Sequence, residues 1–316
     1  MGRADIYSQP DAPDPVLPPE VVVGLARAHL PDGRGVGEVR SVDESGGEAR
    51  VYFLDGDVVV KTQRPHRLRP RTSLAKEAAL LAALADPLAG RIPVLFGYDR
   101  AMVADAGLVE FIVMSRVPGQ AVRHVELPGP ARVEMVQQVG RLLRMVHALA
   151  PAALADGLLP VDGDAAAVRR RLALGFADLV TGLIERPGVW TLPVSPAEVA
   201  TRAIAALPST GARRPVVLHS NPGPTHAFVD AAGRFTGVID FGDAYCSHPA
   251  LDLRAWPDPA ERVALREAYL EGEAADAEFD AVWTVAMIYA DLNTVAKWPE
   301  LAARATDDLA DRLAAL

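Results

Sequence analysis

Residues Pro215–Asp243 read PVVLHSNPGPTHAFVDAAGRFTGVIDFGD and contain three short apolar runs separated by polar loops. The runs Val216–Leu218, Ala227–Val229 and Phe235–Ile239 have the length and composition of short β-strands. The loop Ser220–His226 is rich in Pro and Gly, so it cannot continue a strand. This alternation predicts strands joined as a hairpin around a polar loop.

Polar residues stand where these strands end. His219 follows the first run, Asn221 and His226 lie in the loop, and Asp240 follows the third run. We expect the hairpin to bring these four side chains to one region. Two polar clusters at strand ends, about twenty residues apart, suit a site for a metal ion and phosphate groups.

The stretch resembles the catalytic core of the aminoglycoside phosphotransferase family, which has the protein-kinase-like fold. The family carries a His-Gly-Asp loop, an Asn five residues after that Asp, and then Ile-Asp-Phe/Trp-Gly-Asp. The chain keeps this frame with His219, positions 221 and 226, and IDFGD at 239–243. It departs from the frame at two residues, because the catalytic Asp falls on Asn221 and the metal-binding Asn falls on His226.

A lysine and a glutamate follow the same resemblance in the first half of the chain. Lys61 ends the apolar strand VVVK, and Glu77 comes sixteen residues later in the helical stretch SLAKEAALLAAL. The kinase-like scaffold uses a strand Lys held by a helix Glu to contact nucleotide phosphates. The resemblance also makes the turn at Gly46 and Gly47 the loop over the phosphates, where small residues let the backbone approach an anion.

The resemblance implies roles for the remaining site residues. Asp240 is expected to hold the metal ion, with His226 and Asp243 as further candidate ligands, and His219 and Asn221 belong to the catalytic loop. The implied cofactors are ATP or GTP with Mg²⁺, or with Mn²⁺ because imidazole is a poor ligand for magnesium. Asp252 is expected to hold the backbone of the catalytic loop, and the end of the helix GRLLRMVHAL makes His147 a packed, hydrogen-bonded histidine.

Composition narrows the class of protein. The 316 residues carry a net charge of −9, which disfavours a nucleic-acid partner. Residues 1–119 have 14 Lys and Arg against 16 Asp and Glu, whereas residues 120–316 have 18 against 25. The acidic second half is either ordinary surface charge or an attraction for cationic substrates. The single cysteine, Cys246, excludes a disulfide within the chain. No signal peptide and no long apolar run is recognised, so we expect a cytoplasmic protein without a membrane span.

The predicted fold class is α+β, a two-lobed protein-kinase-like fold with a small antiparallel β-sheet N-lobe and a larger, mainly helical C-lobe. We expect an irregular arm over residues 1–19, a nucleotide-binding N-lobe over 20–117 and a catalytic C-lobe over 118–316. Strands are expected within 36–61 and 92–117, with a tight turn at Asp55-Gly56-Asp57. Helices are expected from 130 to 149, over 166–186, from the capping box at Ser195, and over 260–271, 277–296 and 298–315.

Asn221 leaves three functions open. The first is a slow or specialised phosphotransferase that moves the γ-phosphate of ATP or GTP to a small-molecule hydroxyl, since an amide positions a substrate but is no base. The second is a pseudokinase-like protein that binds nucleotide or another ligand without turnover. The third is a metal hydrolase built from His219, His226, His248 and Asp240, although no established zinc pattern matches. The acceptor and the oligomeric state are not indicated by the sequence.

Overall fold

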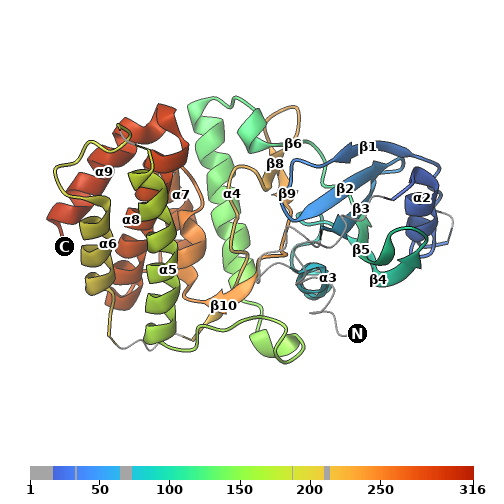
Figure 1. The fold of residues 1–316 in the computed structure, drawn as a ribbon, viewed down its shortest axis with the longest axis horizontal. Helices are drawn as coiled ribbons and strands as arrows, with labels where there is room; N and C mark the ends of the chain where they lie inside the picture. The colour runs from blue at the N-terminus through green and yellow to red at the C-terminus, as the bar shows by residue number, and fades with distance from the viewer. Residues whose placement is uncertain (1–16, 33, 65–72, 187, 210–213) are drawn as a thin grey trace. The chain divides into compact units, whose positions relative to one another are not determined.

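The computed structural model describes residues 17–32, 34–64, 73–186, 188–209 and 214–316, and its fold is drawn in Figure 1. The chain divides into two compact units. Unit 1 comprises residues 1–118, 154–158 and 236–244, and unit 2 comprises 119–153, 159–235 and 245–316. The predicted arm over residues 1–19 lies almost wholly outside the described residues. In the described part of the chain, no helix is long and apolar enough to cross a membrane.

Unit 1 is built on a five-stranded antiparallel sheet with the order β1-β2-β3-β5-β4. Its strands are β1 Val39–Asp43, β2 Ala49–Leu54, β3 Val58–Gln63, β4 Leu95–Val103 and β5 Gly107–Ser115. The turn between β2 and β3 is tight because Gly56 and Asp57 both take positive φ, at 66° and 55°. Leu54 pairs with Val58, so three residues connect the strands, and the predicted turn at Asp55-Gly56-Asp57 is confirmed.

Two helices complete unit 1. Helix α2 Pro19–Arg27 buries Val22, Val23 and Ala26 against the apolar side chains of the sheet. Helix α3 Leu74–Ala83 begins at Ser73, whose hydroxyl accepts a hydrogen bond from the Lys76 amide. Capping of this kind satisfies an amide that has no partner within the helix. Helix α3 therefore starts at a defined residue, which fixes the position of Glu77.

Unit 2 is mainly helical. Its helices are α4 Gly129–His147, α5 Ala165–Ile184, α6 Pro196–Ala206, α7 Pro259–Leu270, α8 Ala277–Lys297 and α9 Ala302–Ala314, with a 3₁₀-helix η4 at Pro249–Arg254. The capping box predicted at Ser195 is present, because its hydroxyl accepts from the Glu198 amide at 3.1 Å. Helices α4 and α7 approach closely at Gly140, where a side chain would collide with the Leu265 carbonyl oxygen.

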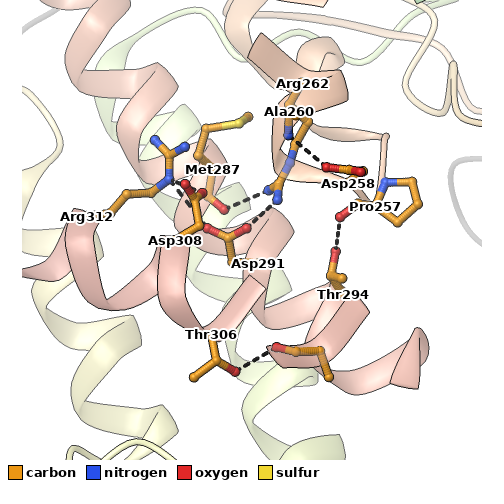
Figure 2. A network of polar contacts seen from close by, with 11 residues as sticks. Pro257, Asp258, Ala260, Arg262, Met287, Asp291, Thr294, Thr306, Asp308 and Arg312 are labelled. Atoms are coloured by element: carbon orange, nitrogen blue, oxygen red, sulfur yellow. Dashed lines mark hydrogen bonds and ion pairs between the residues drawn. The ribbon is translucent and has the colours of Figure 1, made fainter. Parts of the chain in front are cut away.

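Ion pairs around the buried Asp291 join the three C-terminal helices, as Figure 2 shows. The fully buried Arg262 of α7 donates to the Asp291 carboxylate of α8 and, at 3.2 Å, to the Met287 carbonyl oxygen. Arg312 of α9 lies 3.4 Å from Asp291 and 2.8 Å from Asp308. The carboxylate of Asp291 therefore links α7 to α9 through α8.

Short strands in unit 2 correct the predicted hairpin. β7 Val216–Leu218 pairs with β10 Tyr245–Ser247, and β8 Ala227–Val229 pairs with β6 Gln120–Ala121. β7 and β8 are therefore not the two arms of one hairpin. The third predicted strand is β9 Phe235–Val238, which belongs to unit 1 from residue 236 onward. The α+β prediction, an antiparallel sheet followed by a larger helical part, is confirmed.

Candidate active site

The Lys61 side chain in β3 lies between two carboxylates of unit 1. Its ammonium group is 2.8 Å from Glu77 Oε2 and 2.8 Å from Asp240 Oδ1. Glu77 is 1% exposed, Lys61 12% and Asp240 37%. The buried Glu77 thus fixes the Lys61 ammonium group on its buried side, while Asp240 contacts it on the side that is partly exposed to solvent.

Electrostatics keep Lys61 charged in this cluster. Burial lowers the pKa of Lys61, but the attraction of the Asp240 and Glu77 carboxylates outweighs burial and raises the pKa above its ordinary value. One ammonium group and two carboxylates give the cluster a net negative charge. Such a cluster has the chemistry to accept a divalent cation at the exposed carboxylate and a phosphate at the ammonium.

The segment that carries Asp240 is tied to the rest of unit 1 by backbone hydrogen bonds. The Val238 amide donates to the Arg91 carbonyl at 2.9 Å, and the Ser73 amide donates to the Gly242 carbonyl at 3.1 Å. Asp240 itself has a positive φ of 72°, which is uncommon for a residue with a side chain. Asp243 follows, half-buried, on the next turn. These contacts hold the Asp240 carboxylate at a defined place beside Lys61.

The glycine turn between β1 and β2 is also anchored. The buried Arg64 donates to the carbonyl oxygens of Glu44 at 3.2 Å and Gly46 at 3.4 Å. Gly46 and Gly47 are exposed, and a side chain at Gly47 would meet no atom within 4 Å. The described fold therefore does not itself require glycine at 47.

The loop of unit 2 that holds Asn221 is compact. The His219 side chain is fully buried, Asn221 is exposed, and the His226 ring donates from Nδ1 to the Asn221 carbonyl oxygen at 2.7 Å. The rings of His219 and His226 are stacked with their centroids 6.3 Å apart. Ser220 has a positive φ of 83°, and it occupies the position of the Gly in the His-Gly-Asp loop of the aminoglycoside phosphotransferase family. We did not identify Ser220 from the sequence, although the His-Gly-Asp comparison pointed to that position.

Asp252 of η4 anchors this loop. Its carboxylate accepts from the His219 amide and from the Ser220 amide, each at 2.7 Å. The expectation that Asp252 holds the backbone of the loop is confirmed. His147, at the end of α4, is buried and hydrogen-bonded through both ring nitrogens, as expected from the sequence.

The structure sorts the predicted site residues into two groups. Lys61, Glu77, Asp240, Asp243, Gly46 and Gly47 belong to unit 1, whereas His219, Asn221 and His226 belong to unit 2. Among the described residues, no three His, Cys, Asp or Glu side chains form a cluster suited to a metal ion. His248 instead caps η4 by accepting from the Ala250 amide at 3.3 Å.

Comparisons with known proteins find a matching family and matching folds. The model of the phosphotransferase enzyme family matches residues 40–283. The search of curated proteins gave no match. Among solved structures, the GDP complex of aminoglycoside 2′-phosphotransferase-IIIa is 17% identical over 94% of this chain and 99% of its own, with a TM-score of 0.58. Macrolide 2′-phosphotransferase MphH from Brachybacterium faecium is 22% identical over 93% and 98%, with a TM-score of 0.56.

A third solved structure, the ternary complex of APH(2″)-IIa with streptomycin and ATP, is 15% identical over 89% of this chain and 91% of its own, with a TM-score of 0.58. These likenesses show that the chain has the kinase-like fold of aminoglycoside and macrolide phosphotransferases.

Proposed function

Because this chain belongs to the phosphotransferase enzyme family, we propose that it transfers the γ-phosphate of ATP or GTP to a hydroxyl group of a small molecule. The observation that carries the proposal is the position of Lys61 between Glu77 and Asp240. A lysine ammonium fixed by a buried carboxylate is a point charge ready to bind phosphate. GDP and ATP in the complexes of similar folds support a nucleotide as the donor.

The residues present fit a nucleotide with a divalent cation. Lys61 would bind the phosphates, with Glu77 keeping the ammonium group in place, and the turn at Gly46 and Gly47 would approach them with its backbone. The partly exposed Asp240 carboxylate offers oxygen atoms, which magnesium prefers as ligands. Asp243, the next carboxylate along the chain, would offer the cation a second contact. When bound, the cation would neutralise negative charge on the phosphate groups.

Asn221 would position the acceptor rather than deprotonate it. Its side-chain oxygen accepts a hydrogen bond from a hydroxyl group, and its exposure leaves it accessible to a small molecule. An amide takes up no proton, so the general-base contribution of roughly 10²–10⁴ in rate is absent. Transfer is still feasible because positioning and electrostatics dominate phosphoryl transfer. We therefore propose a slow or specialised enzyme.

His219 and His226 would shape the loop around Asn221. The buried His219 and the hydrogen bond from His226 to the Asn221 carbonyl oxygen both restrict the backbone there. If His226 also binds the cation, the preferred metal is Mn²⁺ rather than Mg²⁺, because imidazole is a poor ligand for magnesium. The acceptor class proposed from the similar structures is a polyhydroxylated antibiotic such as an aminoglycoside or a macrolide.

A second function is favoured by the same Asn221. A protein with Lys61, Glu77 and Asp240 in place but no base at 221 is suited to binding nucleotide without turnover, as pseudokinases do. The two functions share nucleotide binding and differ only in phosphate transfer. A test must therefore measure binding and transfer separately.

The first experiment measures binding. The melting temperature is recorded with ATP or GTP and with Mg²⁺ or Mn²⁺, for the wild type and for Lys61→Ala, Asp240→Ala and the control Lys297→Ala, which removes an exposed lysine at the end of α8. At a hundredfold excess over the dissociation constant, a nucleotide that binds only the folded state stabilises it by about 2.7 kcal/mol. We expect the shift in wild type and Lys297→Ala alone. No shift with any nucleotide at millimolar concentration rejects both functions.

The second experiment measures transfer. Labelled phosphate is followed from the bound nucleotide to a panel of aminoglycosides, macrolides and simple sugars, for wild type and Asn221→Asp. We expect Asn221→Asp to raise the rate about tenfold or more, because a carboxylate of nearly the same shape supplies a base. Nucleotide binding without transfer by either protein, with either metal, would leave the ligand-binding function.

A further inference from the structure

Arginine side chains of unit 2 differ in whether they have a counterion. Among the described residues of this unit, four arginines lie over aromatic rings: Arg123 over Trp298 at 5.0 Å, Arg171 over Tyr245 at 3.9 Å, Arg254 over Tyr289 at 4.4 Å and Arg266 over Phe279 at 5.9 Å. Arg171 and Arg266 also form ion pairs with aspartates. Within the described ranges, the guanidinium groups of Arg123 and Arg254, which we call the arginine pair, form neither an ion pair nor a hydrogen bond.

The arginine pair lies beside the loop that holds Asn221. The Arg123 amide donates to the Pro224 carbonyl oxygen at 2.9 Å. A side chain at Gly223 would come within 2.7 Å of the Ala255 carbonyl oxygen, so the backbone directly after η4 packs against the loop. Because Pro224 is three residues from Asn221, their Cα atoms are at most about 11 Å apart. Both arginines therefore belong to the surroundings of Asn221.

The aromatic rings hold the arginine pair in place without using its donors. The Tyr289 ring packs edge-on against Phe176, with their centroids 5.3 Å apart, and a side chain at Gly175 would meet that ring at 2.9 Å. The ring is thus fixed between α5 and the Arg254 guanidinium. A ring face attracts the cation through its π-system, whereas the N–H donors point outward from the edge of the guanidinium plane. They stay available for a ligand.

The carboxylates nearest to Arg254 along the chain have other partners. Asp252 accepts from two amides of the loop at 2.7 Å each, and Asp258 lies 2.8 Å from Arg304. Arg254 is half-buried, and a cation that has lost part of its water without gaining a counterion carries a free-energy cost. An anion from outside the chain is the partner whose chemistry removes that cost.

We propose that the acceptor carries an anionic group, a carboxylate or a phosphate, which the arginine pair binds while Asn221 positions the hydroxyl group that receives phosphate. That the bound anion is the acceptor rests on the proposed function. The planar fork of a guanidinium matches both carboxylate and phosphate with two parallel hydrogen bonds. Arg254, half-buried and fixed on its ring, is the main contact, and the exposed Arg123 is the second.

This inference narrows the polyhydroxylated acceptors proposed above to those with an acid group. An aminoglycoside would bring ammonium groups beside two guanidinium groups, and like charges at such distances repel. The acidic composition of residues 120–316 acts over longer distances, where physiological salt screens charges beyond about 8 Å. The contacts beside Asn221 therefore decide the charge of the acceptor.

The first arm measures binding with four sugars that share one ring and differ in charge: glucose, glucosamine, glucuronate and glucose 6-phosphate. Dissociation constants are measured for the full chain by calorimetry. We expect glucuronate or glucose 6-phosphate to bind about tenfold more tightly than glucose, and glucosamine no more tightly than glucose. The tighter of the two acids distinguishes a carboxylate from a phosphate. Equal affinity for all four, no binding of either acid, or a preference for glucosamine overturns the proposal.

The second arm removes the guanidinium groups. Arg254→Gln and Arg123→Gln should each weaken binding of the preferred acid, about tenfold and about threefold, and Arg254→Lys about threefold because an ammonium group keeps the charge without the fork. The control Arg266→Gln removes an arginine that also lies over an aromatic ring but already pairs with Asp280, so it should change nothing. If Arg254→Gln does not fold, Arg254→Lys and Arg123→Gln carry the test. Unchanged binding in the arginine-pair variants, or the same loss in the control, rejects the assignment.

The third arm separates the acceptor from the nucleotide. The rise in melting temperature that ATP gives with Mg²⁺ or Mn²⁺ should be the same in wild type, Arg254→Lys and Arg123→Gln. Loss of that rise in the variants would mean that the arginine pair binds the nucleotide, which overturns the inference.

Phosphate transfer distinguishes this inference from the proposed function. We expect labelled phosphate to reach the preferred acid, with kcat/KM for that acid about tenfold lower in Arg254→Gln. Acid binding that depends on the arginine pair, without transfer in wild type or Asn221→Asp, contradicts the proposed function and leaves the anion site intact. Transfer to an aminoglycoside that is unaffected by either arginine variant supports the proposed function and overturns the inference.

Discussion

The buried carboxylate of Asp291 makes a quantitative prediction about pH. Burial raises the pKa of Asp291 from 3.8 to about 7, although Arg262 and Arg312 oppose this shift and Asp308 adds to it. These are the charged groups that face Asp291 from α7 and α9, and Figure 2 shows them around it. Each unit of difference between the folded-state and the ordinary pKa changes the unfolding free energy by about 1.36 kcal/mol. The shift of Asp291 from 3.8 to about 7 therefore corresponds to about 4 kcal/mol.

The sign follows from proton binding. A carboxyl whose folded-state pKa is raised binds its proton more tightly in the folded chain, so its contribution to stability is complete below pH 3.8 and is lost as pH rises through about 7. Between pH 5 and pH 8 the loss of unfolding free energy is about 3 kcal/mol. Wild-type protein should therefore lose that much unfolding free energy relative to Asp291→Asn, which cannot titrate.

The assay is urea unfolding of wild type, Asp291→Asn and the control Asp280→Asn at pH 5 and pH 8. Asp280 is an exposed residue of the same helix, so its substitution should give a difference from wild type that does not depend on pH. At pH 5 Arg262 is buried beside an uncharged group in both proteins, so wild type and Asp291→Asn should differ least there and diverge towards pH 8. Parallel pH profiles for wild type and Asp291→Asn would show that Asp291 is ionised throughout, and would refute the reasoning.

Two further predictions concern backbone positions. Gly47→Val should weaken ATP binding about tenfold in calorimetry while changing the unfolding free energy by less than about 0.5 kcal/mol, because the new side chain meets only the space beside the turn; unchanged affinity would mean that the turn does not approach the nucleotide. Ser220→Gly should raise the unfolding free energy by up to about 1 kcal/mol, since glycine takes the φ of 83° without strain. Thermal or urea unfolding checks this, and a clear loss of stability would count against strain at that residue.

The sequence predicted best where a few neighbouring residues dictate the backbone. The turn at Asp55-Gly56-Asp57 needs only residues that tolerate positive φ, and the start of α6 needs only a hydroxyl at Ser195 and an amide three residues later. Both were recognisable without knowledge of the fold. The expectation for Asp252 also held, because the motif comparison gave it a definite partner in the loop.

Prediction failed where the partners are distant in sequence. The β7 strand has three residues, too few to indicate its own partner, and it pairs with β10 after Asp243 rather than with the next apolar run. Tyr269 gave no signal at all, because a tyrosine in an amphipathic helix is ordinary and only the fold places its hydroxyl beside His147. The strain at Ser220 is likewise a property of the folded loop, not of the residue type.

The division of the chain into units has a consequence for its synthesis. The segment 236–244 belongs to unit 1 by its contacts, and its Asp240 pairs with Lys61 across 179 residues of chain. A ribosome adds about 5–20 residues per second, so the first 118 residues wait several seconds or more before their missing piece emerges. Contacts between such distant residues also form slowly.

The same connectivity determines which fragments of the chain contain all the parts of unit 1. A fragment ending at residue 118 contains the five-stranded sheet but lacks Asp240 and the backbone partners that Ser73 and Arg91 use in 236–244. Of the two carboxylates that pair with the Lys61 ammonium group, this fragment keeps Glu77 and lacks Asp240. Expression of the first 118 residues alone should consequently give a chain that is prone to aggregate, whereas a fusion that appends residues 236–244 restores the missing strand end and its carboxylate.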